Sequence, residues 1–589
     1  MYILGLAFGF HDASAALLSD GEVVAAALEE RFTRRKHDPD LPRRAIDYVL
    51  SEGRITSADL DTVVLHESAP KKFDRVVHSA ASNLPAGAAY LEKTVRSWMA
   101  HGKFDVRRRV ADAVGVPLDR IHSVEHHAAH AASAYFASAF DSATVVTMDG
   151  VGEYEAATVW TGRGSRLEKL YSMNIPHSLG LFYSAFTAFL GFEVNEGEYK
   201  VMGMAGFGDP RSVDRIVPLL RLEDDGMLSL DTGYFEFLTP EDRPYTSRLT
   251  DLLGPARTPD SPFSVGDRQR PASSDLETTS RHYADLAASV QSVVEQAIFH
   301  VVESAVRRTG LPDVCLAGGV ALNSLANGKL QRRMSGRLYV QPAAGDAGTS
   351  LGAALFYAHA ERALPRRGAL TTAFLGPDYG QDDVDAALRR GSVRRSHRFE
   401  EEDELLRTVA RRLAEGAVVG VCRGRFEWGP RALGARSILA NPTIPEMQRL
   451  VNEKIKFREP FRPFAPAVLD DRAREFFDLL PPFGLESPDY FMISVANVHA
   501  AKRRVIPAVT HVDGTARVQL VSRATNPWFH RLIACFDELT GVPVVLNTSF
   551  NLRGEPIVAS PWDALWTFGW SGMDVLVLGN VLIEKSELS

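Results

Sequence analysis

The chain has 589 residues, of which 45% are hydrophobic, and its formal net charge is -8. This length exceeds what one hydrophobic core supports and predicts two to four domains of a globular protein. The acidic balance gives no general attraction to nucleic acid or anionic lipid, so any anion-binding site must be a local one.

The N-terminal residues and the cysteines indicate the compartment. Met1 to Gly5 begin a strand without a basic signal segment, and no apolar run reaches the ~18 residues that a membrane span needs. Cys315, Cys422 and Cys535 lie far apart with no CxxC pair, which favours a reducing compartment over a disulfide framework or a zinc ribbon. We therefore expect a cytoplasmic protein without a membrane or nucleic-acid partner.

A pattern of strand, polar turn and hairpin occurs twice. Residues 2–8 are expected to form a strand, and Asp20-Gly21 predicts a tight hairpin between the strands at 15–19 and 22–28. A second strand ends at Met148, before a turn at residues 149–152 and another strand at 156–160. This weak internal repeat resembles the actin, hexokinase and heat-shock ATPase superfold, in which each half offers a turn to nucleotide phosphates.

The histidines at residues 126–130 are candidate metal ligands. The alanine-rich stretch 128–136 predicts a helix, on which His126 and His130 share a face at i, i+4 spacing. Two imidazole nitrogens at this spacing can reach one ion at ~2.1 Å each. The alternative is a polar helix face, because this spacing is common.

Two aspartates complete a possible ligand set. Asp149 follows a β-branched strand at a sharp turn, and Asp346 precedes a predicted helix much later in the chain. Two histidines and two carboxylates form a mixed nitrogen and oxygen set, which suits Fe(II), Zn(II) or Mn(II) better than a thiolate-bound structural zinc.

A glycine pair follows the buried strand expected at residues 314–317. Gly318 and Gly319 let the backbone come close to a flat or phosphorylated ligand. Tight packing of the strand against the following helix is the alternative. Residues 364–368 then form the expected linker to a second domain.

Cationic residues are concentrated in the second domain. They alternate with Gly, Pro and apolar residues, unlike a solvated charged stripe, so several should point inward. A buried arginine needs an anionic partner, and a close charge pair is worth about 4 kcal/mol at an intermediate dielectric. A phosphate pocket explains the pattern best, while ordinary surface charge is the alternative.

Six separated motifs, in one order along nearly the whole chain, carry a family resemblance. They are His11 to Ala16, Glu30 to Arg34, His126 to His130, Gly318 to Asn323, Gly429 to Gly434 and Asn547 to Asn551. Together they resemble the O-carbamoyltransferases that act on tobramycin, cephalosporin, novobiocin, ansamycin and nodulation factors. The resemblance implies an α/β fold with a TsaD-like domain of the actin/Hsp70 ATPase superfold at residues 1–368. A YrdC-like α/β domain is implied at residues 369–589.

The same resemblance implies a two-step reaction. The YrdC-like domain would convert carbamoyl phosphate and ATP, with Mg(II), into carbamoyl adenylate. The TsaD-like domain would pass the carbamoyl group to a hydroxyl of a natural product, such as an antibiotic, and release AMP. The identity of the acceptor and the oligomeric state stay open, with a homodimer as one option.

Particular residues inherit roles from the resemblance. Carbamoyl phosphate and ATP would be bound by Arg431, Lys456, Arg462, Arg517, Asn547 and Ser549. The metal, iron in related proteins with zinc or manganese as alternatives, would be bound by His126, His130, Asp149 and Asp346. The adenylate would be bound by Lys200, Gly318, Gly319 and Asn323. His11 would be the general base, oriented by Asp12, unless it only hydrogen-bonds the ligand.

Other functions fit parts of the pattern. A tRNA threonylcarbamoyl transferase shares the expected fold and predicts a continuous basic surface for RNA. A non-catalytic nucleotide-binding protein of the actin-like class leaves the arginines of the second domain unexplained. A simple kinase is a third option, although the sequence does not indicate a binding pocket for a sugar or an acid substrate.

Overall fold

The computed structural model describes residues 1–237, 243–266, 270–459 and 461–588. The chain divides into two compact units. Unit 1 consists of Met1–Gly5 and Ser57–Arg367, and unit 2 of Leu6–Thr56 and Gly368–Ser589. The division after Arg367 lies one residue before the expected domain boundary, but the segment 6–56 groups with the C-terminal residues. The functions assigned to the two predicted domains stay predictions.

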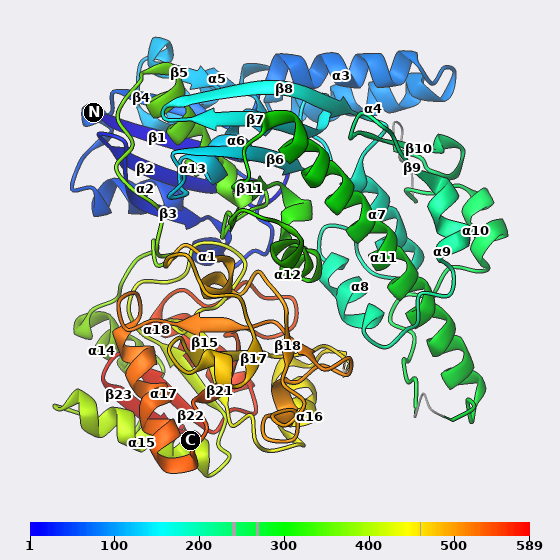
Figure 1. Cartoon of the computed structure of the whole chain (residues 1–589). Helices are drawn as coiled ribbons and strands as arrows, with labels where there is room; N and C mark the ends of the chain where they lie inside the picture. The colour runs from blue at the N-terminus through cyan, green and yellow to red at the C-terminus, as the bar shows by residue number, and fades with distance from the viewer. Residues whose placement is uncertain (238–242, 267–269, 460, 589) are drawn as a thin grey trace. The chain divides into compact units, whose positions relative to one another are not determined.

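A five-stranded sheet with the order β12-β11-β6-β7-β8 forms the centre of unit 1 (Figure 1). Its strands are β6 (Ser142–Met148), β7 (Glu155–Arg163), β8 (Arg166–Asn174), β11 (Val314–Ala317) and β12 (Leu338–Val340). β6 pairs antiparallel with β7 and parallel with β11, and β11 pairs parallel with β12. β6 and β11 are almost wholly buried, as is typical of central strands that are covered on both faces.

A second sheet has the same plan. Its order is β3-β2-β1-β4-β5, with β1 (Tyr2–Ala7), β2 (Ser14–Ser19), β3 (Glu22–Leu28), β4 (Thr62–Leu65) and β5 (Ile121–Ser123). β2 and β3 pair antiparallel around Asp20-Gly21, where both residues have positive φ, so the predicted hairpin is confirmed. In each sheet three strands that are consecutive in sequence, β1 to β3 or β6 to β8, lie side by side, and two later strands follow beyond the first of them. This repeat and the surrounding helices confirm the predicted α/β class with a duplicated, actin-like plan.

Two buried helices lie beside the candidate metal ligands, of which His126 and His130 belong to α6 (His126–Tyr135). Every residue of α6 is buried, and its alanines let α13 (Thr349–Leu355) pack closely against it. Gly352 of α13 lies so near α6 that a Cβ atom would stand 1.8 Å from the carbonyl oxygen of Ala129. Glycine is therefore required there, because any side chain would force the helices apart.

The remaining helices of unit 1 surround these elements. α11 (Asp275–Thr309) is the longest; the Ser274 side chain caps its N-terminus and Gly310, with φ of 68°, ends it. The others are α3 (Ala69–Ala81), α4 (Ala86–Ala100), α5 (Val106–Val114), α7 (Leu179–Phe189), α8 (Glu198–Ala205), α9 (Val213–Ile216), α10 (Ser247–Leu253) and α12 (Ser324–Arg333). Strands β9 (Leu220–Leu222) and β10 (Leu228–Leu230) form a small antiparallel sheet.

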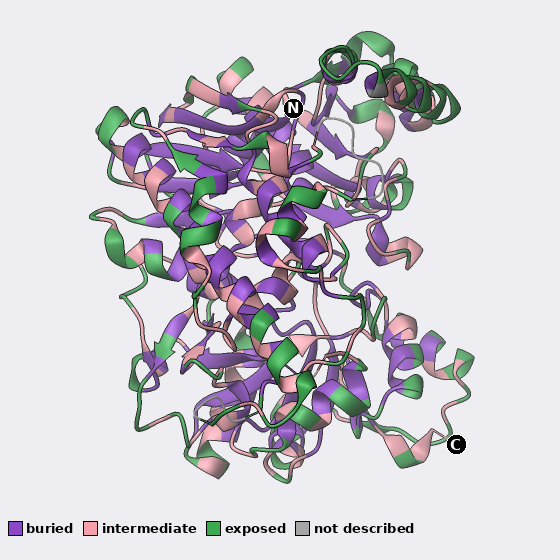
Figure 2. Cartoon of the chain, turned by 90° about the vertical axis from the view of Figure 1, so that its right-hand side faces the viewer, coloured by how far each residue is buried: buried purple, intermediate pink, exposed green. Residues whose placement is uncertain are grey.

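Among the described residues of unit 2, eight strands form one mixed sheet with the order β13-β23-β22-β14-β15-β21-β16-β20. These strands are β13 (His397–Arg398), β14 (Val419–Cys422), β15 (Arg436–Ala440), β16 (Ala465–Leu469), β20 (Gln519–Val521), β21 (Val544–Ser549), β22 (Val575–Leu578) and β23 (Val581–Glu584). A three-stranded sheet contains β17 (Phe477–Asp478), β18 (Ala496–Val498) and β19 (Thr515–Ala516). The strands are mostly buried (purple in Figure 2).

Local sequence signals set the helix ends of unit 2. Asn526 and Ser560 cap the N-termini of α17 (Pro527–Thr540) and α18 (Pro561–Trp570), and each helix begins with proline. The other helices are α1 (Glu30–Thr33), α2 (Arg43–Glu52), α14 (Gln381–Arg390), α15 (Glu402–Ala414), α16 (Met447–Leu450) and the π-helix η9 (Val451–Lys456).

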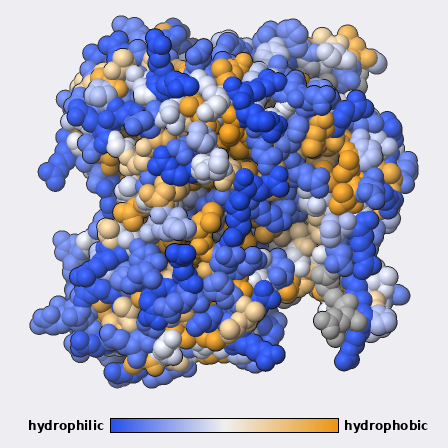
Figure 3. Space-filling model, in the orientation of Figure 1, coloured by the Kyte–Doolittle hydropathy of each residue, from blue (hydrophilic) through white to orange (hydrophobic). Residues whose placement is uncertain are grey.

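Hydrophilic residues predominate on the face of the molecule shown in Figure 3, with hydrophobic residues in scattered groups between them. Within residues 1–237, 243–266, 270–459 and 461–588, each helix is too short or too polar to cross a lipid bilayer.

Candidate metal centre and anion-binding cluster

The fold of unit 1 brings the four predicted metal ligands together. His126 and His130 lie one turn apart on α6, and their Nε2 atoms are 3.1 Å from each other. Asp149 follows the last residue of β6, and Asp346 begins the short helix η7 (Asp346–Gly348) that precedes α13. One ligand atom from each of the four residues lies within 4.8 Å of the other three. The helical spacing that suggested the two histidines and the strand end that suggested Asp149 are both present.

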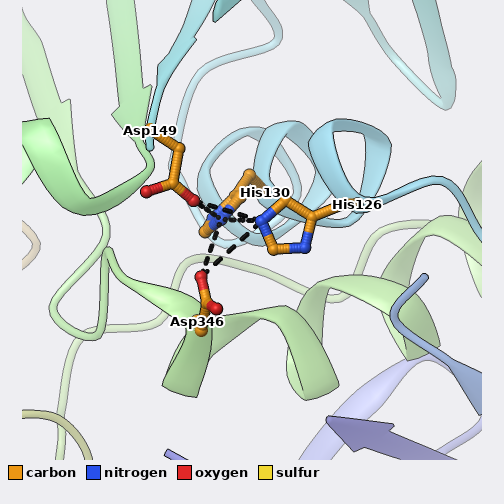
Figure 4. A group of neighbouring side chains, drawn as sticks. All are labelled: His126, His130, Asp149 and Asp346. Carbon is orange, nitrogen blue, oxygen red and sulfur yellow. Dashed lines mark hydrogen bonds and ion pairs between the residues drawn. The ribbon is translucent and has the colours of Figure 1, made fainter. Parts of the chain in front are cut away.

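The two carboxylates approach the imidazole pair from opposite sides (Figure 4). Oδ2 of Asp149 lies 3.1 Å from Nε2 of His126 and 3.0 Å from Nε2 of His130. Oδ1 of Asp346 lies 3.6 Å from each of the same nitrogens. Four potential donors to a cation therefore point at one small volume, with the histidines almost wholly buried.

The electrostatics of the group follow from burial and mutual charge. Burial lowers the pKa of His130, but its contacts with Asp149 and Asp346 outweigh it and raise that pKa to about 9. Burial raises the pKa of Asp149, and the hydrogen bonds from the two histidines outweigh it and hold that pKa well below its usual range. Without a cation, a proton on an imidazole balances the carboxylate charge.

The donor set fits a divalent transition metal. Two imidazole nitrogens and two carboxylate oxygens converge, and a cation can replace the imidazole proton as the partner of the carboxylates. The Nδ1 atoms of both histidines are buried without a hydrogen-bond partner among the described residues. The set does not distinguish iron from zinc or manganese, so the metal and its ligands stay predictions.

The loop after β6 holds this arrangement in place. The other oxygen of Asp149, Oδ1, accepts hydrogen bonds from the backbone N–H groups of Gly150 at 2.8 Å and Gly319 at 3.1 Å. Glu153 accepts from the backbone N–H of His126 at 3.0 Å and from that of Ser68 at 2.7 Å. One loop thus supplies a candidate ligand and anchors the first turn of α6.

His127, the middle histidine, lies outside the ligand group. Its Nε2–H donates to the carbonyl oxygen of Glu155 at 2.9 Å, and its Nδ1 lies 2.6 Å from the Thr147 hydroxyl. Burial and the neighbouring histidines lower its pKa to about 3. His127 is therefore a neutral residue that joins α6 to the central sheet.

The predicted adenylate-binding residues have structural partners. Gly318 has φ of +91°, and a Cβ atom there would lie 2.2 Å from the carbonyl oxygen of Met148, so close packing requires this glycine. Gly319 donates its N–H to Asp149. The side chain of Asn323 caps α12 and exchanges hydrogen bonds with Gln291, while Lys200 Nζ lies 5.7 Å from the ring centroid of Phe192. Their adenylate role stays a prediction.

The predicted catalytic pair lies in unit 2. Nδ1 of His11 is 3.0 Å from Oδ2 of Asp12, as an orienting carboxylate requires. Asp12 has a second partner that the sequence did not suggest, because Nδ1 of His37 lies 2.7 Å from its other oxygen. The motif from Glu30 to Arg34 is also partly buried. Arg31 is buried and donates to the carbonyl oxygen of Gly429 at 2.9 Å.

Unit 2 also collects positive charge. Burial lowers the pKa of Arg517 well below its usual range, and the positive charges of Arg431, Arg458 and Arg462 lower it further. Nε of Arg517 is buried without a hydrogen-bond partner among the described residues. Burial and the charges of Arg458 and Arg462 also lower the pKa of Lys456.

Neutral oxygens hold Lys456 in this cluster. Its Nζ donates to the backbone oxygens of Ser549 at 2.7 Å and Asn551 at 2.9 Å and contacts the Asn551 Oδ1 at 2.7 Å. These partners fix the position of Nζ, and the charge of Glu555 opposes the lowering of the Lys456 pKa. The cluster of Arg431, Lys456, Arg458, Arg462 and Arg517 is called the cationic cluster below.

Buried polar groups position the loop that bears Arg431. Oε1 of Glu427 accepts from the backbone N–H groups of Leu433, Ala435 and Arg436 at 2.8, 2.8 and 3.1 Å. Asn547 donates to the carbonyl oxygen of Ala432 at 3.1 Å. Asn547 thus supports the loop directly, whereas a contact with phosphate is still only predicted.

Sequence reasoning missed several of these residues. His37, Glu153, Glu427 and Arg458 are not among the residues to which the motifs assign a role. Their proximity to motif residues was the available signal, since Glu153 follows Asp149 within the same loop and Glu427 precedes Gly429.

Comparison with known proteins gives consistent matches. A family model described as Carbamoyltransferase N-terminus matches residues 2–355, and one described as Carbamoyltransferase C-terminus matches residues 410–585. An uncharacterised protein of Synechocystis sp. is 38% identical over 99% of this chain and 97% of its own length. The nodulation protein NolNO of Sinorhizobium fredii is 37% identical over 98% of this chain and 80% of its own length. Nodulation protein U of Rhizobium tropici is 28% identical over 98% of this chain and 95% of its own length.

Solved structures are more remote. Component A of (R)-2-hydroxyglutaryl-CoA dehydratase from Acidaminococcus fermentans is 15% identical with a TM-score of 0.32, over 60% of this chain and 97% of its own. HypF of T. kodakarensis is 16% identical with a TM-score of 0.32, over 61% of this chain and 47% of its own. Likenesses this remote carry no functional information.

Proposed function

Since this chain belongs to the carbamoyltransferase family, we propose that it is an ATP-dependent O-carbamoyltransferase. It takes the carbamoyl group of carbamoyl phosphate, forms carbamoyl adenylate, and transfers the group to a hydroxyl of a natural product. The observation that carries the proposal is the cationic cluster, in which burial and the neighbouring positive charges lower the pKa of Arg517 and Lys456.

The cationic cluster suits the first step because both substrates are polyanions. Water releases inorganic phosphate from carbamoyl phosphate and leaves carbamate. A carbamate oxygen then attacks the α-phosphorus of ATP, and the bond to the bridging oxygen breaks so that pyrophosphate leaves with the electron pair. Arginine is the side chain best matched to phosphate oxygens, and each bound anion relieves the repulsion among the arginines.

The second step needs a base and an oriented acceptor. The Asp12 carboxylate holds Nδ1–H of His11, so Nε2 carries the lone pair and takes the proton of the acceptor hydroxyl. The acceptor oxygen attacks the carbamoyl carbon, and the carbon to oxygen bond breaks so that AMP leaves with its electron pair. His126, His130, Asp149 and Asp346 would hold the metal ion, which supplies positive charge to stabilise a phosphate that leaves.

The decisive experiment follows pyrophosphate release from purified protein given ATP, carbamoyl phosphate and either Fe(II) or Mg(II). We expect release that depends on carbamoyl phosphate and falls at least about a hundredfold in Arg431→Ala, because removal of a phosphate clamp costs several kcal/mol. Arg449→Ala is the matched control, since Arg449 lies on α16 in an exposed pair with Glu453 at 2.7 Å.

A folded, metal-loaded protein that releases no pyrophosphate with carbamoyl phosphate, even with candidate acceptors present, would contradict carbamoyl transfer. If release is found, a screen of hydroxyl compounds identifies the acceptor. His11→Asn is its control, because this variant should still form carbamoyl adenylate and fail to transfer the carbamoyl group.

A further inference from the structure

A chain of three side chains runs through the predicted catalytic pair of unit 2. Asp12 accepts through Oδ2 from Nδ1–H of His11 at 3.0 Å and through Oδ1 from Nδ1–H of His37 at 2.7 Å. Each oxygen of the carboxylate therefore has its own histidine. The contact with His37 is the shorter of the two, and the ring centroids of the histidines are 6.4 Å apart.

The backbone fixes His37 against Asp12 from both sides. The N–H of Ala13 donates to the carbonyl oxygen of Asp38 at 2.9 Å, and that of Gly9 donates to Pro39 at 2.8 Å. The N–H of His37 itself donates to Oε2 of Glu30 at 3.0 Å. These bonds tie the segments 9–13 and 37–39 together, so the Asp12–His37 distance does not depend on flexible side chains alone.

Asp12 and His37 also share an unusual backbone conformation. Their φ angles are 52° and 53°, in the left-handed region that residues other than glycine rarely adopt. Such conformations persist only where the surrounding structure determines them and are typical of functional sites. The strained backbone therefore agrees with a functional role for the relative position of Asp12 and His37.

We propose that His37 is a positioning residue that holds Oδ1 of Asp12 so that Oδ2 stays on Nδ1 of His11. This inference rests on the proposed function, in which Nε2 of His11 takes the acceptor proton. Without a donor on Oδ1 the carboxylate can rotate about its Cβ–Cγ bond, and the imidazole can exchange its Nδ1–H form for the Nε2–H form. The latter form has no lone pair on Nε2 and is inactive as a base.

The charges around Asp12 and His37 also favour the two hydrogen bonds to the Asp12 carboxylate. The hydrogen bond and negative charge of Asp12, with the charge of Glu30, raise the pKa of His37, although burial and Lys36 oppose them. Burial raises the pKa of Asp12, but its hydrogen bonds with His11 and His37 hold it well below its ordinary value. Asp12 is thus ionised and accepts from both rings.

The test compares two amides at position 37. Nε2 of His37 is buried without a hydrogen-bond partner among the described residues, so only Nδ1 carries the proposed function. His37→Asn keeps an N–H group at the δ position, whereas His37→Gln moves the same amide one carbon further out. The control is His397→Asn, because His397 is exposed and its Nε2 contacts Glu587 at 3.1 Å elsewhere in unit 2.

The main readout is the tautomer of His11, measured from the 15N shifts of its ring in histidine-labelled full-length protein and assigned with His11→Asn. We expect His37→Asn and His397→Asn to keep the Nδ1–H form. In His37→Gln the share of this form should fall at least about twofold, and AMP release from ATP, carbamoyl phosphate and the acceptor identified by the screen should slow about 10- to 100-fold.

An unchanged His11 tautomer in His37→Gln overturns the proposal, as does a His37→Asn protein that matches the glutamine variant in both readouts. Thermal midpoints of both variants show whether they fold equally well. If the wild-type protein releases no pyrophosphate with carbamoyl phosphate, the proposed function fails, while the tautomer measurement still decides the role of His37 because it needs no substrate.

Discussion

The two candidate sites differ in how they balance charge. In unit 1, His126 and His130 face Asp149 and Asp346 at 3.0–3.6 Å, so opposite charges meet within the protein. In unit 2, the positive charges of Arg431, Arg458 and Arg462 act on Arg517, although Arg462 also pairs with Glu459 at 3.6 Å. The first site thus pairs opposite charges within the protein, whereas like charges predominate in the second, which we expect to bind an anion.

This difference predicts opposite effects for the same kind of substitution. Removal of a charge from a buried pair leaves its partner uncompensated, which destabilises the folded state. Removal of a charge from a group of like charges relieves repulsion and stabilises the folded protein while it weakens ligand binding. Four measurements test the comparison, from the largest expected effect to the smallest.

Asp149→Asn should cause the largest loss. We expect the free energy of unfolding in EDTA to fall by about 3–5 kcal/mol, because two buried imidazoles lose their closest carboxylate. Affinity for Zn(II) or Mn(II) should fall at least about a hundredfold, measured by calorimetry. Asp112→Asn, at an exposed position on α5, is the control. Equal metal binding by both variants would exclude Asp149 as a ligand.

Arg517→Gln should stabilise the ligand-free protein by about 1–2 kcal/mol, since it removes one buried like charge. Denaturant titrations with and without ATP or carbamoyl phosphate measure both effects. The stabilisation that these ligands give to the wild type should disappear in the variant. A loss of stability without ligand would show that Arg517 is balanced within the protein and would remove the contrast between the sites.

Acidification should reveal the neutral histidine beside the cationic cluster. Burial and the charge of Arg517 lower the pKa of His511 to about 4, although Asp513 opposes them. The unfolded chain binds a proton near pH 6.5 while the folded protein does not, so stability is present above pH 6.5 and is lost as pH falls toward 4.

His511→Asn removes this contribution. Between pH 6.5 and 4.5 the thermal midpoint of the wild type should therefore fall by about 2–4 °C more than that of the variant. Arg517→Gln should show part of the same effect because the pKa of His511 rises toward its ordinary value. Parallel pH curves for all three proteins would contradict a neutral His511 in the folded state.

Glu153→Gln should have the smallest effect. The amide oxygen still accepts one hydrogen bond from the first turn of α6, but the second acceptor and the negative charge are lost. We expect about 1 kcal/mol less stability and about tenfold weaker metal binding. Glu92→Gln on α4, where Glu92 pairs with Arg96 at the surface, is the control.

Several features of this protein follow from sequence alone because they depend on short-range periodicity. The Asp20-Gly21 hairpin forms as its turn chemistry requires, and His126 and His130 share one face of α6 because helical spacing places them there. Asp149 stands at a strand end for the same kind of local reason.

Tertiary structure alone decides which distant groups meet and which charges are balanced. His37 reaches Asp12 because backbone bonds tie two loops together, and no periodicity in the sequence encodes that contact. Arg436 and Arg517 look alike in sequence. Yet Arg436 donates to the carbonyl oxygens of Ala559 and Gly424, whereas Arg517 faces other arginines. The solvation of each buried charge depends on neighbours brought together by folding, so only the folded chain distinguishes a structural arginine from a candidate anion-binding one.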